Sequence, residues 1–491
     1  MSVLAIDAGT TGVTALVVAA DGTVTSRGYQ EFPQYYPHPG WVEHLPEEIW
    51  QAALAACDRA LSRAPGPVAA LGITNQRETA VVWDRATLAA PRRAIVWQDR
   101  RTARLCDELR RAGHEDRISE LTGLRLDPYF TGTKLTWLAT EEPATWAGLA
   151  DGTLAAGTVD SYLIARLTGG ACHVTDASNA SRTLLFDITA GRWSAELCDL
   201  LRVPAGALPE VVPSTGVAGR TDPASFLGLD LPIAGIAGDQ QAALFGQACF
   251  TPGDAKCTFG TGSFVLANTG GTVARPGNGL LSTVAWMDGT GALTYALEGS
   301  VFVTGAAVQW LRDGLGLLDD AAQSEAIARS VLDSGGVVFV PALTGLGAPD
   351  WDPDARGAMF GITRGTTRAH LVRATLEAIA YEVRDVFDVM VTGDWRTGRT
   401  LRADGGASAN DLLMQLQADQ LQVPVERPEI METTALGAAF LAGLATGVWS
   451  SPAELADTWR LGRRFEPERR DDEAHDRWRR AVERTKGWAR D

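Results

Sequence analysis

The chain has 491 residues, of which 45% are hydrophobic and 21% charged, so it is long enough for two or three domains with complete cores. Its 44 Lys and Arg against 60 Asp and Glu give a net charge of -16, which argues against nucleic acid or an anionic membrane as a partner. The start shows no basic leader, and no apolar run approaches the roughly 18 residues of a membrane span. The six cysteines show no C-x-x-C spacing and predict reduced thiols, not zinc ligands. We therefore expect a cytoplasmic protein without a membrane span.

Apolar, β-branched runs alternate with helical patterns along the whole chain. Runs typical of strands occur at 4–9, 67–74, 92–98, 231–238, 335–342 and 400–406. Apolar residues recur at helical spacing over 49–64 and 369–390. This alternation predicts an α/β protein.

Glycine-rich turns follow three of these runs. They read DAGTTG at 7–12, FGTGS at 259–263 and DGGASAN at 404–410. The first two are similar and lie far apart in the chain, which suggests two related halves with one turn each. The backbone N–H groups of such turns bind an anion without a cationic side chain, so two turns could clamp a polyphosphate from two sides. The alternative for each is an ordinary tight turn.

An aspartate ends the first run, directly before its glycine turn. A phosphate bound at the turn would repel Asp7 unless a Mg²⁺ ion lay between them. Asp7 and the glycine turn together therefore predict that any phosphate bound here arrives with a divalent cation.

Two further stretches carry groups suited to a small polar substrate. In GITNQRETAVVWD at 72–84, Arg77 and Glu78 interrupt a strand-like sequence. Neighbours on a strand point to opposite faces, but at a strand end both could reach one cleft and bind a neutral polyol. The alternative is a surface ion pair worth about 0–1 kcal/mol. In IAGDQQAALFG at 236–246, Asp239 begins a helical pattern, where it is either an N-cap or a general base.

Taken together, these segments resemble the FGGY family of carbohydrate kinases. The resemblance covers about residues 3–450 and includes the family patterns YFTGTKLTWLATE at 129–141 and GAMFGITRGTTRAHLVRATLE at 357–377. It is strongest to the members that phosphorylate glycerol, through segments such as GITNQRET, IVWQDRRT, GIAGDQQAALFGQ and ETTALGAAFLAGL. The implied fold has two actin-like, ribonuclease-H-like domains, at 1–247 and 248–491, flanking a catalytic cleft.

The resemblance also implies ATP-dependent phosphorylation of glycerol to glycerol 3-phosphate, with Mg²⁺, by a homo-oligomer of two or four chains. Asp239 is similar to the family's general base. The implied glycerol site consists of Arg77, Glu78, Trp97, Tyr129, Asp239, Gln240 and Phe264. The implied ATP site consists of Thr10, Thr11, Gly260, Thr261, Gly305, Gln309, Gly406 and Asn410, with Asp7 holding Mg²⁺.

The first turn departs from this pattern. Members that act on glycerol typically read DQGTTSSR, whereas this chain reads DAGTTGVT, with Thr14 in place of the arginine. We expect Mg²⁺, backbone N–H groups and threonine hydroxyls to neutralise the ATP phosphates instead. Two alternatives stay open: a kinase for a longer polyol or ketose such as erythritol or xylulose, and a non-catalytic actin-like nucleotide binder, which only the missing arginine favours.

Overall fold

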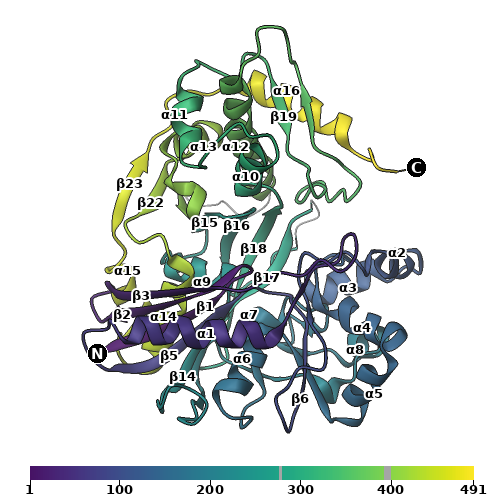
Figure 1. Cartoon of the computed structure of the whole chain (residues 1–491), viewed down its shortest axis with the longest axis vertical. Coiled ribbons are helices and arrows are strands. Elements are labelled where there is room, and N and C mark those ends of the chain that lie inside the picture. Colours follow the sequence, from purple (N-terminus) through teal and green to yellow (C-terminus); the bar gives the residue numbers. More distant parts are fainter. Residues whose placement is uncertain (276–278, 392–399, 491) are drawn as a thin grey trace.

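The computed structural model describes residues 1–275, 279–391 and 400–490. Figure 1 shows two α/β lobes joined by long strands of the central part of the chain. The N-terminal segments build the lower lobe, and most of the residues after 300 build the upper one. Within the described ranges, no helix has the length and apolar character needed to cross a membrane.

The first lobe is built on a six-stranded sheet in the order β13-β14-β5-β1-β2-β3. Its strands are β1 (Ser2–Ala8), β2 (Gly12–Ala19), β3 (Val24–Glu31), β5 (Val68–Asn75), β13 (Thr215–Arg220) and β14 (Pro232–Gly238). Strands β1 and β2 form an antiparallel hairpin, while β1, β5 and β14 run parallel. Alternate residues of β1 point into different hydrophobic clusters, Leu4 and Ile6 into one and Val3 and Ala5 into the other. The sheet is therefore buried on both faces, as parallel strands require.

The second sheet repeats this topology. It has seven strands in the order β17-β18-β16-β15-β21-β22-β23. They are β15 (Ala255–Phe259), β16 (Ser263–Gly270), β17 (Leu281–Met287), β18 (Leu293–Val301), β21 (Leu401–Asp404), β22 (Val425–Pro428) and β23 (Leu461–Phe465). Strands β15 and β16 form a hairpin, and β15, β21 and β22 run parallel. Apart from the edge strand β17, the order matches the first sheet strand for strand, which confirms the two related halves.

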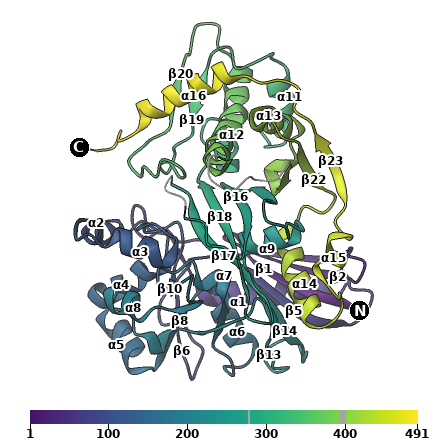
Figure 2. The same cartoon turned by 180° about the vertical axis from the view of Figure 1, so that it is seen from behind.

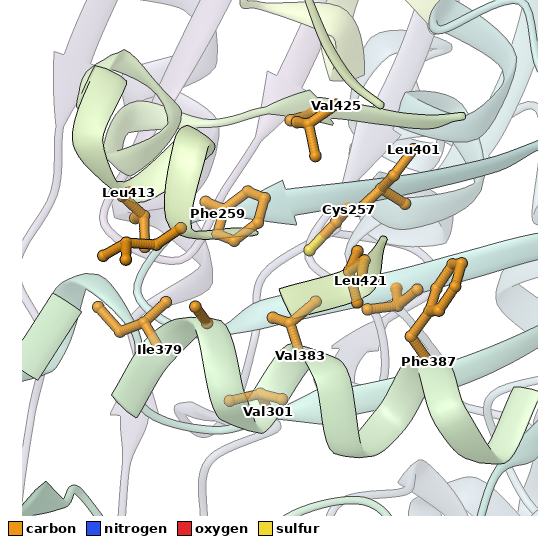
Figure 3. Packing of buried hydrophobic residues seen from close by; sticks show 14 of the residues in the cluster. Cys257, Phe259, Val301, Ile379, Val383, Phe387, Leu401, Leu413, Leu421 and Val425 are labelled. Carbon is orange, nitrogen blue, oxygen red and sulfur yellow. The ribbon is translucent and has the colours of Figure 1, made fainter. Parts of the chain in front are cut away.

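Helices cover both sheets. Around the first lie α1 (Pro46–Leu61), α6 (Val159–Leu167), α9 (Asp239–Gly246) and α14 (Thr433–Ala445), and around the second α10 (Gly305–Asp313), α11 (Gln323–Arg329), α12 (Arg368–Val391), α13 (Asp411–Leu421) and α16 (Asp472–Thr485). Figure 3 shows how α12 packs: Ile379, Val383 and Phe387 face Cys257 and Leu401 of the sheet. Helix α12 therefore forms one wall of the second core.

The remaining elements form the outer parts of both lobes. Those of the first lobe are β4 (Glu43–His44), β6 (Val81–Asp84), β7 (Ala94–Ile95), α2 (Ala103–Arg111), α3 (Glu115–Thr122), α4 (Thr131–Glu141), α5 (Pro143–Asp151), β8 (Leu154–Gly157), β9 (Val174–Asp176), α7 (Ala177–Ala180), β10 (Phe186–Asp187), β11 (Arg192–Trp193), α8 (Ala195–Leu200) and β12 (Glu210–Val212). Later in the chain come β19 (Val338–Val340), β20 (Ala358–Phe360) and α15 (Pro452–Ala456).

The strand expected over 92–98 is wrong in length. Only β7 has strand geometry there. Before it, the side chain of Arg92 turns to Glu142, with Nε 2.9 Å from Oε2. After it, the side chain of Trp97 donates a hydrogen bond to Thr10, with Nε1 3.0 Å from Oγ1. The side chains of Arg92 and Trp97, on either side of β7, thus make their contacts outside the two-stranded sheet of β4 and β7.

Helix α14 returns from late in the chain to the first lobe, where it packs on β1, β5, β14 and α9 (Figure 2). The approach to α9 is so close that two glycines are required. A Cβ on Gly437 would lie 1.8 Å from the carbonyl oxygen of Ala242, and one on Gly246 would lie 2.0 Å from that of Thr433. The second half of α9, from Ala242 to Gly246, is thereby held against α14.

We expect Gly437→Ala to destabilise the protein by about 1–3 kcal/mol or more, because the backbones of α9 and α14 would have to separate. Thermal or urea unfolding of the two proteins measures the effect. Gly66→Ala is the matched control, since nothing lies within 4 Å of its Cβ position. Equal stability of both variants would contradict the close packing of α14 on α9.

Candidate active site

A cleft of about 140 Å³ lies where the hairpin turns of both sheets meet. Its walls are formed by Thr10, Arg77, Glu78, Trp97, Tyr129, Asp239, Gln240, Thr258, Gly260, Thr261, Gly262 and Phe264. Every residue predicted to contact the acceptor substrate is in this set, as are Thr10, Gly260 and Thr261 from the predicted phosphate site. The structure therefore brings together side chains that are far apart in the sequence.

Arg77 and Glu78 reach the same cleft because the chain leaves its strand just before them. Strand β5 ends at Asn75, and Glu78 has a left-handed backbone with φ 65°. The Nε atom of Arg77 lies 3.0 Å from Oδ1 of Asp239 and 3.8 Å from Oε1 of Glu78. The side chains of Arg77 and Glu78 are 2% and 1% exposed, so the alternative of a surface ion pair is wrong.

The strained backbone of Glu78 is held from helix α4. Its carbonyl oxygen accepts hydrogen bonds from Thr131 Oγ1 at 3.0 Å and from Lys134 Nζ at 3.2 Å. Lys134 is buried, and this burial lowers its pKa to about 7. A non-glycine residue at positive φ needs such support from its surroundings.

A buried ionic network lies behind the cleft. Glu298 of β18 accepts from Arg77 Nη1 at 2.5 Å and from Arg182 Nη2 at 2.8 Å, while Arg182 Nε donates to Glu78 at 2.7 Å. Burial alone would raise the pKa of Glu298, but Arg182 and Arg77 outweigh it and lower that pKa to about 2. Burial raises the pKa of Glu78 against the opposing effect of the same two arginines.

Sequence reasoning missed Arg182 and Glu298. Glu298 was detectable in principle, because it is a lone carboxylate in the apolar strand LTYALEGSV. A charge in such a strand must be paired to be buried, so it indicates a partner elsewhere in the chain. Arg182 follows the short helix α7 and carried no comparable signal.

Asp239 stands at the first position of α9, with Gly238 as the N-cap. Its Oδ1 accepts from the backbone N–H of Gln240 at 2.7 Å as well as from Arg77. Burial raises the pKa of Asp239, while Arg77 and Lys256 oppose the shift. The carboxylate is about a quarter exposed, so it is open to the cleft on one side.

Three aromatic rings form one wall. Trp97 meets Tyr129 edge to face at 5.6 Å and Phe264 at 6.4 Å between ring centroids. These rings line the cleft, and Trp97 also donates from Nε1 to Thr10 Oγ1. The wall is apolar toward the cleft and fixed in orientation.

The two glycine turns have similar backbones. In the first, Gly9 N–H donates to Gly12 at 3.0 Å, and in the second Gly260 N–H donates to Gly262 at 2.9 Å. Helix α10 begins on the second turn, where Gly305 N–H donates to the carbonyl of Gly260 at 3.0 Å. Each sheet therefore presents one tight turn to the cleft, as the sequence predicted.

Not all predicted nucleotide residues enter the cleft walls. Thr11 and Gln309 are exposed outside them. Gly406 follows Gly405, whose Cβ position lies 2.6 Å from the carbonyl oxygen of Phe259, so this turn adjoins the end of β15. Asn410 is engaged within the protein: its side chain caps α13 through Leu413 N–H at 2.9 Å and donates to Ser324 at 3.2 Å.

Asp7 is the second-last residue of β1 and lies opposite Thr14 of β2. Burial, with a contribution from the nearby charge of Asp239, raises the pKa of Asp7 to about 7. Within the described part of the chain, no hydrogen bond or ion pair reaches its carboxylate. A half-buried acid without a protein partner is suited to binding a cation.

The duplicated sheets, with a polar cleft at their junction, are the architecture of a two-domain carbohydrate kinase. The model for the N-terminal domain of the FGGY family of carbohydrate kinases matches residues 2–246, and that for the C-terminal domain matches residues 255–446. The chain therefore belongs to the FGGY family.

Relatives and solved structures agree with this assignment. The chain is 56% identical over 491 residues to a glycerol kinase of Aromatoleum aromaticum, covering 99% of each chain. It is 53% identical to glycerol kinase 2 of Thermotoga maritima, again over 99% of both. Among solved structures, glycerol kinase of Plasmodium falciparum with ADP matches with a TM-score of 0.88 at 34% identity, covering 99% of this chain and 98% of that one. Xylulose kinase of Rhodospirillum rubrum matches with a TM-score of 0.83 at 27% identity, with the same coverage.

Proposed function

We propose that this kinase transfers the γ-phosphoryl group of ATP to glycerol and forms glycerol 3-phosphate. The observation that carries the proposal is the cleft itself, in which Arg77, Glu78 and Asp239 face an aromatic wall beside two glycine turns. The full-length relatives named as glycerol kinases support it. In this proposal the aromatic wall packs on the carbon chain and the charged groups bind the hydroxyls.

Asp239 is the proposed general base. Arg77 and the N–H of Gln240 hold its Oδ1, which leaves Oδ2 to accept the proton of the attacking hydroxyl. The hydroxyl oxygen forms a bond to the γ-phosphorus, the bond from that phosphorus to the bridging oxygen breaks, and the electron pair leaves with ADP. The turns at Gly260 and Thr10 lie on the same cleft, where their N–H groups and hydroxyls can bind phosphate oxygens.

Selection of a small acceptor follows from size and charge. The cleft is about 140 Å³ in volume, and Trp97, Tyr129 and Phe264 close one side of it. A longer sugar needs space where these rings lie. An acceptor that lacks one hydroxyl leaves a buried charged group without its partner, which is costly.

Asp7 is the proposed protein ligand of Mg²⁺. Its half-buried, unpartnered carboxylate near Asp239 fits a divalent cation, because a positive charge between the two relieves their repulsion. Among the residues that the structure describes, no group of three or more His, Cys, Asp or Glu could form a complete protein metal site. This fits Mg²⁺, which is often held by one or two carboxylates together with phosphates and water. When bound, the ion supplies charge neutralisation for the phosphates.

The raised pKa of Asp7 predicts a pH dependence. Protonation of Asp7 as the pH falls below about 7 removes the charge that would attract Mg-ATP, so kcat/KM for Mg-ATP should fall on that side. Thr14→Arg would place a cation directly opposite Asp7, lower its pKa and move this acid limb to lower pH. Thr14→Val is the matched control, and the acid limb of its pH profile should stay at the pH of the wild type. Identical limbs in both variants would show that Asp7 does not set the pH dependence.

The acceptor is tested by ADP release from Mg-ATP with glycerol, dihydroxyacetone, erythritol, xylulose or no acceptor. We expect strong stimulation by glycerol and little by the longer compounds. Preferential stimulation by xylulose or erythritol would mean that the cleft takes a longer substrate. ATP binding without stimulation by any acceptor would favour the non-catalytic nucleotide binder.

A further inference from the structure

A buried lysine lies directly behind the wall of the cleft. Lys256 of β15 is 0% exposed, and its ammonium group does not line the cleft. Its Nζ lies 2.5 Å from Oε1 of Gln240 and 2.8 Å from Oγ1 of Thr258. Both of these partners do line the cleft. Lys256 thus contacts two cleft residues from the protein side.

These contacts fix the direction of two hydrogen bonds. A lysine ammonium only donates, so the carbonyl of the Gln240 amide must face Lys256 and the NH₂ group must point away from it. The hydroxyl of Thr258 accepts from Lys256, which leaves its own hydrogen to be donated elsewhere. Within the described ranges, neither Nε2 of Gln240 nor Oγ1 of Thr258 has a protein acceptor. Two unused donors therefore remain at the cleft wall.

The position of the donors indicates what they bind. Gln240 follows Asp239 on α9, and Thr258 precedes the Gly260 turn on β15. The donors thus lie between the proposed base and a proposed phosphate turn. Negative charge on the transferring phosphoryl group is spread over its equatorial oxygens, and donors already aimed at such charge stabilise it strongly in a site that excludes water.

We propose that Thr258 donates a hydrogen bond to the phosphoryl group during transfer, and that Lys256 is the positioning residue that fixes it as a donor. This inference rests on the proposed function, because it assigns a role within the same site. The NH₂ group of Gln240 belongs, with Arg77, Glu78 and Asp239, to the glycerol site expected from the sequence, which leaves the Thr258 hydroxyl for the phosphoryl group. Arg77 is the one cationic side chain among the described residues that line the cleft, and its guanidinium is already paired with Asp239 and Glu298.

Lys256 fixes both hydrogen-bond directions in its ammonium form. Burial lowers the pKa of this lysine, and the carboxylates of Asp404 and Asp239 oppose that shift. A neutral amine would keep two N–H donors but would also carry a lone pair able to accept from Gln240 Nε2 or Thr258 Oγ1. The two carboxylates favour the ammonium form, in which Lys256 can only donate to Gln240 and Thr258.

The first test compares Thr258→Val with Thr258→Ser. Valine keeps the shape of threonine without its hydroxyl, whereas serine keeps the hydroxyl. We expect Thr258→Val to lower kcat about 10²-fold or more with KM for glycerol within about threefold, and Thr258→Ser to stay close to the wild type. Lys256→Met, which removes both donated hydrogen bonds, should lower kcat at least as much as Thr258→Val.

Three results would overturn the inference. A rise in KM for glycerol at unchanged kcat would assign the Thr258 hydroxyl to the acceptor substrate. Equal losses in the serine and valine variants would show that Thr258 acts through packing. Wild-type kcat in Thr258→Val would show that its hydroxyl does not contribute to transfer.

A binding measurement separates this inference from the proposed function and from misfolding. ADP with fluoroaluminate, a mimic of the transferring phosphoryl group, should bind the wild type more tightly than ADP alone. Thr258→Val should lose about tenfold or more of that gain while its affinity for ADP is unchanged. If the wild type does not phosphorylate glycerol, the proposed function fails, and this binding comparison still decides the role of the Thr258 hydroxyl. An equal gain in wild type and Thr258→Val would refute it.

Discussion

Asp239→Asn should lower kcat for glycerol phosphorylation by about 10²–10⁴-fold, the usual contribution of a positioned general base. The amide is nearly the same size as the carboxylate and can still accept from Arg77 Nε and Gln240 N–H, so the geometry of the site should survive. It cannot, however, take the hydroxyl proton. Initial rates of ADP formation at saturating glycerol and Mg-ATP measure the loss, and calorimetric titration with ADP should show nearly unchanged nucleotide affinity.

Asp230→Asn is the matched control for this experiment. Asp230 is an exposed aspartate whose Oδ1 lies 2.7 Å from Arg220 Nε, and neither residue lines the cleft. The control should retain full turnover. If Asp239→Asn stays within about tenfold of the wild type, which corresponds to about 1.4 kcal/mol, then Asp239 is not the base.

Glu298→Ala should lower the free energy of unfolding by about 3–5 kcal/mol, because it leaves Arg77 and Arg182 as buried charges without their shared partner. It should also raise KM for glycerol, since Arg77 is held between Glu298 and the cleft. Urea unfolding monitored by tryptophan fluorescence gives the change in stability. Asp230→Ala removes a pair whose side chains are more than half exposed, and should cost less than about 1 kcal/mol.

The pH dependence of stability gives a second readout of Glu298. Its pKa in the folded protein is about 2, below the ordinary value of 4.5, so its contribution is complete above the ordinary value and is lost as the pH falls toward 2. Glu298→Ala should therefore lose less stability between neutral pH and pH 3 than the wild type does. If Glu298→Ala lowers the free energy of unfolding no more than Asp230→Ala does, the buried network does not stabilise the contact between the two lobes.

Local sequence patterns were sufficient for much of the fold. The alternation of apolar runs and helical patterns predicted the α/β class, and the paired turns at 7–12 and 259–263 predicted the duplicated halves. The path of α14 was not predictable in this way. Its return to the first sheet depends on contacts between Gly437 and α9, which no local pattern encodes.

The site residues also fall into two groups: those that local sequence patterns reveal and those that only tertiary contacts reveal. Residues next to recognisable turns, such as Thr10, Gly260 and Asp239, could be selected because strand ends and helix starts meet at one edge. Arg182 and Lys256 could not, since their importance comes from partners distant in the sequence. The left-handed backbone of Glu78 was equally hidden, because Thr131 and Lys134 of α4 support it through tertiary hydrogen bonds.

In the proposed reaction, the cleft transfers a phosphoryl group from ATP to a hydroxyl of glycerol. The most direct test is ³¹P NMR of the products after incubation of purified protein with Mg-ATP and glycerol. We expect one phosphate ester, on a terminal carbon of glycerol, formed in equal amount to ADP and abolished in Asp239→Asn. Inorganic phosphate as the only new product, or no consumption of ATP at all, would contradict it.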